Sequence, residues 1–215
     1  MKTVIIIPAR YGSSRYEGKP LIKINKIPLV IRVVKKCVKA IGSENVFVAT
    51  DDLRIAKVVM DYGYNYIMTS KFNLTGTDRV AEASLKVKAD IIINVQGDEP
   101  LIEPKDIIKV INFKKKEKNF VVCAYCNLKR DENENRRTIP KIVFNEKNEL
   151  LYCSRSPIPV SKKNNVKINY FKQVCIYAFT KKELKDFRNL KRKSNLEKIE
   201  DIEILRFFEL NKKIK

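Results

Sequence analysis

The segment that follows the first apolar run of the sequence carries groups that can bind phosphate. Residues 8–20 read Pro-Ala-Arg-Tyr-Gly-Ser-Ser-Arg-Tyr-Glu-Gly-Lys-Pro, which brings together two arginines, a lysine, two serines and two glycines. Guanidinium, ammonium and backbone N–H groups bind phosphoryl oxygens, and hydroxyl groups add further donors. The spacing is neither that of a P-loop nor that of a dinucleotide-binding fingerprint. The segment predicts a polyphosphate site, with a solvated basic turn as the alternative on composition alone.

A second polar segment follows the most apolar run of the chain. Residues 90–95 read Asp-Ile-Ile-Ile-Asn-Val, and residues 96–100 read Gln-Gly-Asp-Glu-Pro. Ligands of open α/β sheets bind beyond the carboxyl ends of the strands, so we expect both polar segments at one edge of a sheet. Mg²⁺ prefers carboxylate and phosphate oxygens, which makes Asp98 the candidate metal ligand. The alternative is a turn in which Asp98 and Glu99 cap the next helix.

The elements that must position these segments follow from the hydrophobic pattern. Buried-strand patterns occur at residues 3–8, 46–50, 66–68 and 90–95. Helical patterns occur at residues 30–41, after Asp51, at 78–86 and after Pro104. Such alternation is typical of a doubly wound, mostly parallel, Rossmann-like α/β sheet with helices on both faces.

The pattern changes after the fourth predicted helix. Strands without intervening helices are predicted at residues 120–126, 141–144, 150–154 and 173–180. We interpret them as an antiparallel or mixed extension of the same sheet. Two helices are predicted to close the chain, the second over residues 196–210, with apolar residues at every third position and Glu197, Glu200 and Glu203 on another side. The absence of a repeat or linker favours a single domain over residues 1–215.

The net charge of +20 predicts an anionic partner. The basic residues are spread along the chain and lack the interleaved aromatic residues of a single-strand nucleic-acid binder. We therefore expect a polyphosphate and a carboxylated sugar as partners and no nucleic acid, with a basic nucleic-acid-binding module as an alternative.

The cysteines and the apolar runs indicate the compartment. The five cysteines are scattered and lie mostly within apolar runs, which is typical of reduced core residues in a cytoplasmic protein. The apolar runs fall far short of the roughly 20 residues that span a bilayer, so no membrane partner is expected.

Four segments together resemble the acid-sugar cytidylyltransferases, specifically the 3-deoxy-manno-octulosonate cytidylyltransferase family. They are residues 8–20, residues 75–79 (Thr-Gly-Thr-Asp-Arg), residues 94–100 (Asn-Val-Gln-Gly-Asp-Glu-Pro) and residues 194–206 (Ser-x-Leu-Glu-x-Ile-Glu-x-x-Glu-x-Leu-Arg). The resemblance covers essentially the whole chain. It implies a magnesium-dependent enzyme that joins CTP to an acidic 3-deoxy-ketose sugar, releases pyrophosphate and serves the synthesis of cell-surface polysaccharide. A cytidylyltransferase for a different acid sugar is a further alternative.

The resemblance implies a nucleotide site built from the first two segments. Its residues are Pro8, Ala9, Arg10, Ser13, Ser14, Arg15, Lys19, Thr75, Gly76 and Thr77. The implied catalytic residues are Arg10 and Lys19, which neutralise the phosphates, and Asp98, which holds Mg²⁺. Thr77 could instead cap a helix that begins at Asp78.

The resemblance also implies a site for the acidic sugar. Its residues are Gln96, Arg155, Gln173, Tyr177 and Glu200. An arginine can pair with a sugar carboxylate through two parallel hydrogen bonds, and a carboxylate accepts from sugar hydroxyls. The alternative for Glu200 is a solvated helix face shared with Glu197 and Glu203.

The sequence departs from the family pattern in two places. The family has a histidine where this chain has Gln173, and this chain contains no histidine, so this position can hydrogen-bond but cannot titrate. The family also continues with a strand and a Val-Asp-Thr-Pro-Glu-Asp-Leu segment whose aspartate binds metal, and this segment is missing here. We therefore expect CTP binding with slow turnover, and a CTP-binding, catalytically weakened relative is an alternative. Family members pair as homodimers, and we expect an interface within residues 141–180.

Overall fold

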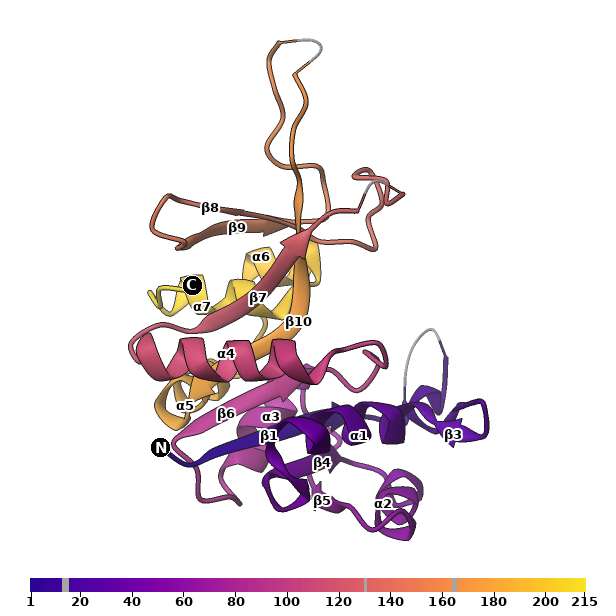
Figure 1. The fold of residues 1–215 in the computed structure, drawn as a ribbon. Helices are drawn as coiled ribbons and strands as arrows, with labels where there is room; N and C mark the ends of the chain where they lie inside the picture. The colour runs from indigo at the N-terminus through magenta and orange to yellow at the C-terminus, as the bar shows by residue number, and fades with distance from the viewer. Residues whose placement is uncertain (13–15, 130, 164–165) are drawn as a thin grey trace.

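A mixed β-sheet runs through the middle of the molecule (Figure 1). The computed structural model describes residues 1–12, 16–129, 131–163 and 166–215. Within them one sheet has the strand order β5-β4-β1-β6-β10-β8-β9, and β7 also pairs with β10. The strands are β1 (Thr3–Ala9), β4 (Val46–Thr50), β5 (Asn65–Met68), β6 (Ile91–Val95), β7 (Val122–Asn127), β8 (Lys141–Phe144), β9 (Leu150–Ser154) and β10 (Phe171–Thr180).

The first half of the sheet is parallel. Strand β1 pairs in parallel with β4 and with β6, and β4 pairs in parallel with β5. Their sequences are nearly continuous runs of branched apolar residues because both faces of the sheet are covered. Alternate side chains divide between two cores, so Val4 and Ile6 lie in one and Ile5 and Ile7 in the other. The predicted doubly wound arrangement is confirmed.

The second half of the sheet is antiparallel, as predicted. Strand β10 runs antiparallel to β6, β7 and β8, and β8 runs antiparallel to β9. The connection between β9 and β10 includes a long excursion that projects away from the body of the molecule (Figure 1). Strand β10 pairs with β6 only from Ile176 onward, so its first residues, which pair with β8, lie beyond the carboxyl end of β6.

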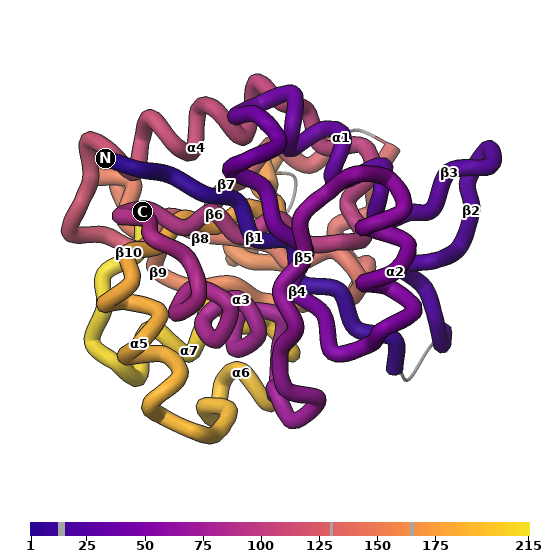
Figure 2. Tube along the Cα trace, turned by 90° about the horizontal axis from the view of Figure 1, so that it is seen from below, coloured from indigo at the N-terminus to yellow at the C-terminus, as the bar shows by residue number. Residues whose placement is uncertain are grey.

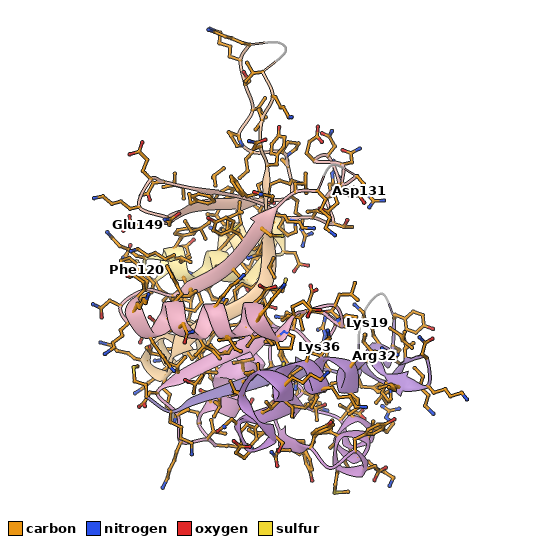
Figure 3. All side chains as sticks on the ribbon, viewed as in Figure 1. Lys19, Arg32, Lys36, Phe120, Asp131 and Glu149 are labelled. Atoms are coloured by element: carbon orange, nitrogen blue, oxygen red, sulfur yellow. The ribbon has the colours of Figure 1, made fainter. Side chains whose placement is uncertain are left out.

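Helices cover both faces of the sheet (Figure 2). One face packs against α1 (Leu29–Ile41), α2 (Leu53–Asp61) and α4 (Pro104–Lys116), and the other against α3 (Gly76–Ser84), α5 (Lys181–Asn189) and α7 (Arg206–Glu209). Helix α6 (Asn195–Glu200) lies between α5 and α7 in sequence. An ion pair joins α1 to the start of α4: Lys36 Nζ lies 2.9 Å from Oε1 of Glu103, the residue that precedes α4. Figure 3 shows the position of Lys36 on α1.

Short elements complete the fold. They are the 3₁₀ turns η1 (Lys19–Leu21), η2 (Ser43–Asn45) and η3 (Glu203–Leu205), and the hairpin of β2 (Lys23–Ile24) and β3 (Ile27–Pro28). Arg32 of α1 donates from Nε to the carbonyl oxygen of Ile24 at 2.9 Å (Figure 3). This bond fixes the hairpin to the start of α1, next to Lys19.

The predicted single helix over residues 196–210 is wrong. Helix α6 ends at Glu200, Asp201 adopts a left-handed conformation with φ 49°, and η3 and α7 follow separately. Each step of three residues along an α-helix falls roughly 60° short of a full turn. Apolar residues at every third position therefore drift around the helix and cannot stay on one face over this length. Ile199 is accordingly exposed, while Ile202 and Leu205 are buried. The break turns Glu197, Glu200 and Glu203 toward three different neighbours.

Two further features concern the helices and the cysteines. Within the described residues, none of the helices combines the length and the apolar character that crossing a membrane requires. All five cysteines are free thiols.

Candidate nucleotide and sugar site

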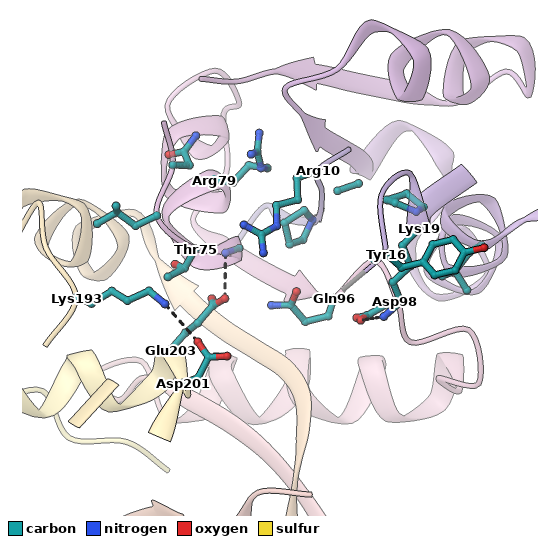
Figure 4. A pocket seen from close by; sticks show the side chains of 18 residues that line it. Arg10, Tyr16, Lys19, Thr75, Arg79, Gln96, Asp98, Lys193, Asp201 and Glu203 are labelled. Atoms are coloured by element: carbon teal, nitrogen blue, oxygen red, sulfur yellow. Dashed lines mark hydrogen bonds and ion pairs between the residues drawn. The ribbon is translucent and has the colours of Figure 1, made fainter. Parts of the chain in front are cut away.

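A cavity of about 440 Å³ opens at the carboxyl edge of the parallel strands (Figure 4). Its walls come from the segments after β1 and β6, from η1, from the first turn of α3 and from the chain between α5 and η3. The predicted residues that line it are Pro8, Ala9, Arg10, Lys19, Thr75, Gly76, Gln96 and Asp98. The structure therefore brings the two polar segments of the sequence together at one edge of the sheet. The predicted residues Ser13, Ser14 and Arg15 lie outside the described residues.

The basic side of the cavity carries an ion pair between two predicted catalytic residues. Lys19, the first residue of η1, places its Nζ 2.5 Å from Oδ2 of Asp98 (Figure 4). Both side chains are a little under half exposed, at 44% and 49%. Arg10 follows β1 and lines the same cavity. Two cationic side chains and one carboxylate thus lie together on this side of the cavity.

Gly97 allows the turn after β6 to touch the end of β1. A Cβ atom at this position would lie 2.8 Å from the carbonyl oxygen of Pro8, closer than real Cβ contacts come. A larger residue would push the two segments apart. The close approach brings Asp98 beside the segment that carries Arg10 and Lys19.

The first turn of α3 forms the opposite wall. Thr75 is its N-cap: Thr75 Oγ1 accepts from the backbone N–H of Asp78 at 3.2 Å and donates to Asp78 Oδ2 at 2.7 Å. The helix therefore begins one residue before Thr77, so Thr77 is not the cap. Thr77 is buried, and its hydroxyl oxygen accepts from Asn94 Nδ2 at 3.3 Å. Thr75 and Gly76 reach the cavity, while Thr77 lies behind them.

Glu203 is a cavity residue that the sequence pattern did not identify. Its carboxylate accepts from the backbone N–H groups of Gly76 at 3.0 Å and Thr77 at 2.7 Å (Figure 4). Burial raises the pKa of the Glu203 carboxyl, and the hydrogen bonds from Thr77 and Gly76 act in the opposite direction. A carboxylate therefore already occupies the positive end of the α3 dipole, and its free lone pairs favour ligand groups that donate hydrogen bonds.

Arg206 connects the C-terminal segment to α3. Its guanidinium is fully buried and donates to both carboxylate oxygens of Asp78, at 2.7 and 3.0 Å, and to both oxygens of Glu197, at 2.6 Å each. It also stacks on Phe187, with Cζ 3.8 Å from the ring centroid. Glu197 is buried rather than on a solvated face. This network fixes the segment that presents Glu203 to the cavity.

The predicted sugar residues Arg155 and Glu200 contact each other. Glu200 Oε2 accepts from the backbone N–H of Arg155 at 2.8 Å, and its Oε1 accepts from Ser154 Oγ at 2.7 Å. The Arg155 guanidinium donates to the carbonyl oxygens of Arg137, Glu200 and Asp201. Asp201 lines the cavity, whereas Arg155 and Glu200 are not among the lining residues. Glu200 is thus engaged in folding contacts rather than free on a solvated helix face.

Gln173 and Tyr177 lie apart from the cavity. Gln173 is buried, lines a separate cavity of about 870 Å³ between α4 and the antiparallel strands, and its Nε2 lies 3.6 Å from Cys123 Sγ. Tyr177 is buried among apolar residues and packs its ring 6.2 Å from that of Phe179. Of the predicted sugar residues, Gln96 alone lines the first cavity among the described residues.

The donor set at Asp98 fits a hard cation that shares its ligands with phosphate. The described residues contain no cluster of three or more acidic, cysteine or histidine side chains that could hold a metal by itself. Mg²⁺ is commonly held by one or two carboxylates together with substrate phosphates and water, and Asp98 is half exposed beside two phosphate-binding candidates. Asp98 and Glu99 do not cap α4, which begins at Pro104.

Other cavity residues were also missed by the sequence pattern. They are Tyr16, Pro20, Leu29, Asn73, Leu74, Arg79, Gly97, Lys193 and Asp201. Lys193 and Asp201 form an ion pair at 3.3 Å (Figure 4). The guanidinium of Arg79 donates to Asp51 Oδ2 at 2.9 Å and to Thr69 Oγ1 at 2.6 Å. The wall opposite Lys19 is therefore mixed in charge.

Comparison with known proteins places this geometry in a family. Residues 4–214 match the family described as cytidylyltransferase. The chain is 40% identical to 3-deoxy-manno-octulosonate cytidylyltransferase of Escherichia coli over 95% of this chain and 82% of that protein. It is 39% identical to 8-amino-3,8-dideoxy-manno-octulosonate cytidylyltransferase of a Shewanella species over 100% of this chain and 89% of that protein.

A solved structure agrees with the sequence comparison. The structure of CMP:2-keto-3-deoxy-manno-octonic acid synthetase in complex with CTP superposes with a TM-score of 0.91 and 38% identity, covering 100% of this chain and 88% of that chain. A basic nucleic-acid-binding module is not favoured by these matches. The chain belongs to the cytidylyltransferase family and is an enzyme of the cytidylyltransferase class.

Proposed function

We propose that this enzyme transfers CMP from CTP to 3-deoxy-manno-octulosonate or its 8-amino analogue, with release of pyrophosphate. The proposal is supported by relatives of both names at similar identity. The observation that carries it is one cavity that holds Arg10, Lys19 and Asp98 on one side and the α3 N-terminus with Glu203 on the other. Such a cavity offers separate places for a triphosphate and for a ligand rich in hydrogen-bond donors.

The nucleotide is proposed to lie across the end of β1. Arg10 and Lys19 bind the triphosphate, and the cytosine lies against Thr75 and Gly76, which line the cavity. The remaining lone pair of the Thr75 hydroxyl oxygen can accept from the amino group of the base. Lys19 leaves Asp98 when the phosphates enter, because a surface ion pair contributes only about 0.2–1 kcal/mol. The contributions of Ser13, Ser14 and Arg15 remain predictions from the sequence.

Asp98 is proposed to hold Mg²⁺ together with the triphosphate. When bound, the cation would neutralise charge on the departing pyrophosphate. The chain's own residues do the rest: Arg10 and Lys19 align the phosphates, and Gln96 on the same turn as Asp98 orients the acceptor. The sugar hydroxyl oxygen forms the new bond to the α-phosphorus, and the bond from that phosphorus to the α,β-bridging oxygen breaks. The bridging oxygen leaves with pyrophosphate, and the hydroxyl proton passes to water.

The acceptor is proposed to enter from the side of Asp201 and Glu203. Gln96 lines the cavity, and Arg155, which is not among the lining residues, donates to the carbonyl oxygen of the lining residue Asp201 at 3.0 Å. Arg155 uses three of its N–H donors on carbonyl oxygens, so two remain for a carboxylate. Gln173 and Tyr177 are kept as predicted sugar contacts that would need the acceptor to extend toward β10.

We further propose a cytoplasmic homodimer of single-domain chains. The cytoplasm supplies CTP, and the antiparallel part of the chain, residues 141–180, is the proposed interface. The proposed CMP-sugar would be used in the synthesis of cell-surface polysaccharide, including lipopolysaccharide.

Pyrophosphate release tests the proposed function. The chain is incubated with Mg²⁺ and CTP together with 3-deoxy-manno-octulosonate, its 8-amino analogue or sialic acid, and the CMP-sugar is identified by mass spectrometry. Product with either octulosonate supports the proposal. UTP in place of CTP is the control for base recognition. CTP binding without product for all three sugars would contradict the transferase function.

A further inference from the structure

The segment that carries both phosphate-binding cations is closed at its base by Tyr11 and Gly18. The backbone N–H of Gly18 donates to the carbonyl oxygen of Tyr11 at 2.9 Å, and Gly18 has φ +69°. A Cβ atom at Gly18 would lie 3.2 Å from Cε2 of Tyr11, so the ring packs directly on the glycine. Arg10 precedes Tyr11, and Lys19 follows Gly18. This contact therefore sets where both cations leave the segment.

Arg54, from the first turn of α2, stacks on the Tyr11 ring. Its guanidinium carbon lies 3.3 Å from the ring centroid, well inside the range of a cation–π contact. The lining of the cavity includes neither Tyr11 nor Arg54. Neither residue can therefore contact a ligand in the cavity directly, so a steric effect on that ligand must pass through Arg10 and Lys19.

Arg54 is itself fixed by Asp52. Arg54 donates from Nε to Asp52 Oδ1 at 2.9 Å and from Nη2 to Oδ2 at 2.7 Å, and its backbone N–H donates to Oδ1 at 2.9 Å. These bonds hold the pKa of the Asp52 carboxyl below its usual range. The backbone N–H of Asp52 donates to Thr50 Oγ1, at the end of β4, at 3.2 Å. A continuous set of contacts thus runs from a buried strand to Gly18.

We propose that Tyr11 and Arg54 are positioning residues for the triphosphate, which hold Arg10 and Lys19 at the spacing that the phosphates require. The proposal rests on the proposed function, because it takes CTP as the ligand of the cavity. Arginine suits the role because its planar guanidinium can stack on a ring and pair with a carboxylate at the same time, which the compact lysine ammonium does not reproduce. The stack affects phosphate binding through the positions of Arg10 and Lys19, and it does not affect the binding of the cytidine part.

Binding measurements on single and double variants test the proposal. Calorimetry with Mg·CTP and with inorganic pyrophosphate is compared with cytidine binding followed by ligand-observed NMR. We expect Arg54→Ala and Tyr11→Leu each to raise the Kd of both phosphate ligands by about 5- to 10-fold, which lies within the range for a cation–π contact. The double variant should be no weaker than the weaker single variant, since the two residues act as one unit. Cytidine binding should not change.

Conservative variants separate positioning from charge and from general stability. Tyr11→Phe should retain wild-type binding, whereas Arg54→Lys should resemble Arg54→Ala although it keeps the charge. Lys57→Ala is the matched control, because it removes a cation from the exposed side of α2, where Lys57 pairs with Asp61 at 3.4 Å. Thermal melts verify that each variant is folded.

Several results would overturn the proposal. Wild-type-like pyrophosphate binding in Arg54→Ala would do so even if Tyr11→Leu failed to fold, because Arg54 is largely exposed. Additive effects in the double variant would show that Tyr11 and Arg54 act independently rather than as one unit. Wild-type-like binding by Arg54→Lys would assign the effect of Arg54 to its charge alone. A different result would show that only the proposed function fails. The wild-type chain would then bind CTP, and the variants would show the expected increases in Kd, but no CMP-sugar would form. A wild-type chain that binds no CTP would overturn both.

Discussion

Lys19 and Asp98 pair with each other across the two segments that form the basic side of the cavity, with Lys19 Nζ 2.5 Å from Asp98 Oδ2. One residue follows the loop after β1, and the other follows β6. Each neutralises the other while the cavity holds no phosphate, and each is exposed enough for the pair to open at small cost. Opening the pair yields a cation for the phosphates and a carboxylate for Mg²⁺.

Replacing Asp98 by asparagine should remove magnesium-dependent turnover without unfolding the protein. The amide keeps the shape of the side chain but loses the charge that holds a hard cation, so we expect turnover to fall at least about 100-fold. The melting temperature should change by less than about 4 °C, since only a half-exposed ion pair is lost. Pyrophosphate release and thermal melts are measured on the same samples.

Glu99→Gln is the matched control for Asp98→Asn. Glu99 is the next residue along the chain but lines the second cavity, on the far side of the turn. It should keep near wild-type turnover. Full activity in Asp98→Asn, or equal loss in both variants, would remove Asp98 from the metal site.

Replacing Lys19 or Arg10 by alanine should each lower turnover by about 100- to 1,000-fold, because each removes a preorganised cation from a developing polyanion. Steady-state pyrophosphate release at saturating CTP and sugar measures the effect. Lys23→Ala is the control, since it removes the same charge from the exposed strand β2, outside the cavity lining. Turnover equal to that of Lys23→Ala in both variants would show that the segment is merely basic surface.

The meeting of Lys19 and Asp98 could be predicted from the sequence alone. Both follow buried apolar runs, and parallel strands bring such segments to one edge of a sheet. Local periodicity carried this prediction because the strands are short, continuous and separated by clear helical patterns. Gln96 belongs to the same predicted segment as Asp98, whereas only the family resemblance assigned Thr75 and Gly76 to the site.

The C-terminal half of the site could not be predicted in the same way. The apolar repeat of three in residues 196–210 was interpreted as one helix, yet Asp201 breaks it and sends Glu203 to the amides of α3. This partnership joins residues more than a hundred positions apart, and hydrophobic periodicity contains no information on such pairs. Strand β10 gives a second case. Its register against β7 shifts between Val174 and Tyr177, and Gln173 lines the second cavity while Tyr177 lies in the core cluster that contains Phe179.

Replacing Arg206 by methionine should destabilise the protein by about 3–5 kcal/mol, because it leaves Asp78 and Glu197 buried without their cation. Urea unfolding measures the change in the free energy of unfolding. Lys213→Met is the control, since Lys213 pairs with Glu149 at 3.4 Å on the surface and should contribute about 0–1 kcal/mol. A change no larger than that of the control would mean that the buried network does not hold the C-terminal segment.

Replacing Glu203 by glutamine should change how stability depends on pH. Burial raises the pKa of this carboxyl above its ordinary value of 4.5, so the folded protein disfavours its ionised form relative to the unfolded chain. The contribution of Glu203 to the free energy of unfolding is therefore fully present below pH 4.5 and is lost as the pH rises through the raised pKa. Glutamine cannot ionise, and the hydrogen bond that it loses to one α3 amide adds only an offset that does not vary with pH. We expect the difference in stability, wild type minus Glu203→Gln, to decrease as the pH rises above 4.5, measured by urea unfolding up to pH 8.

Glu209→Gln is the control, because Glu209 is exposed on α7 and its substitution should leave the pH profile unchanged. Parallel profiles for the wild type and Glu203→Gln would show that the hydrogen bonds from Gly76 and Thr77 fully offset the burial of this carboxylate.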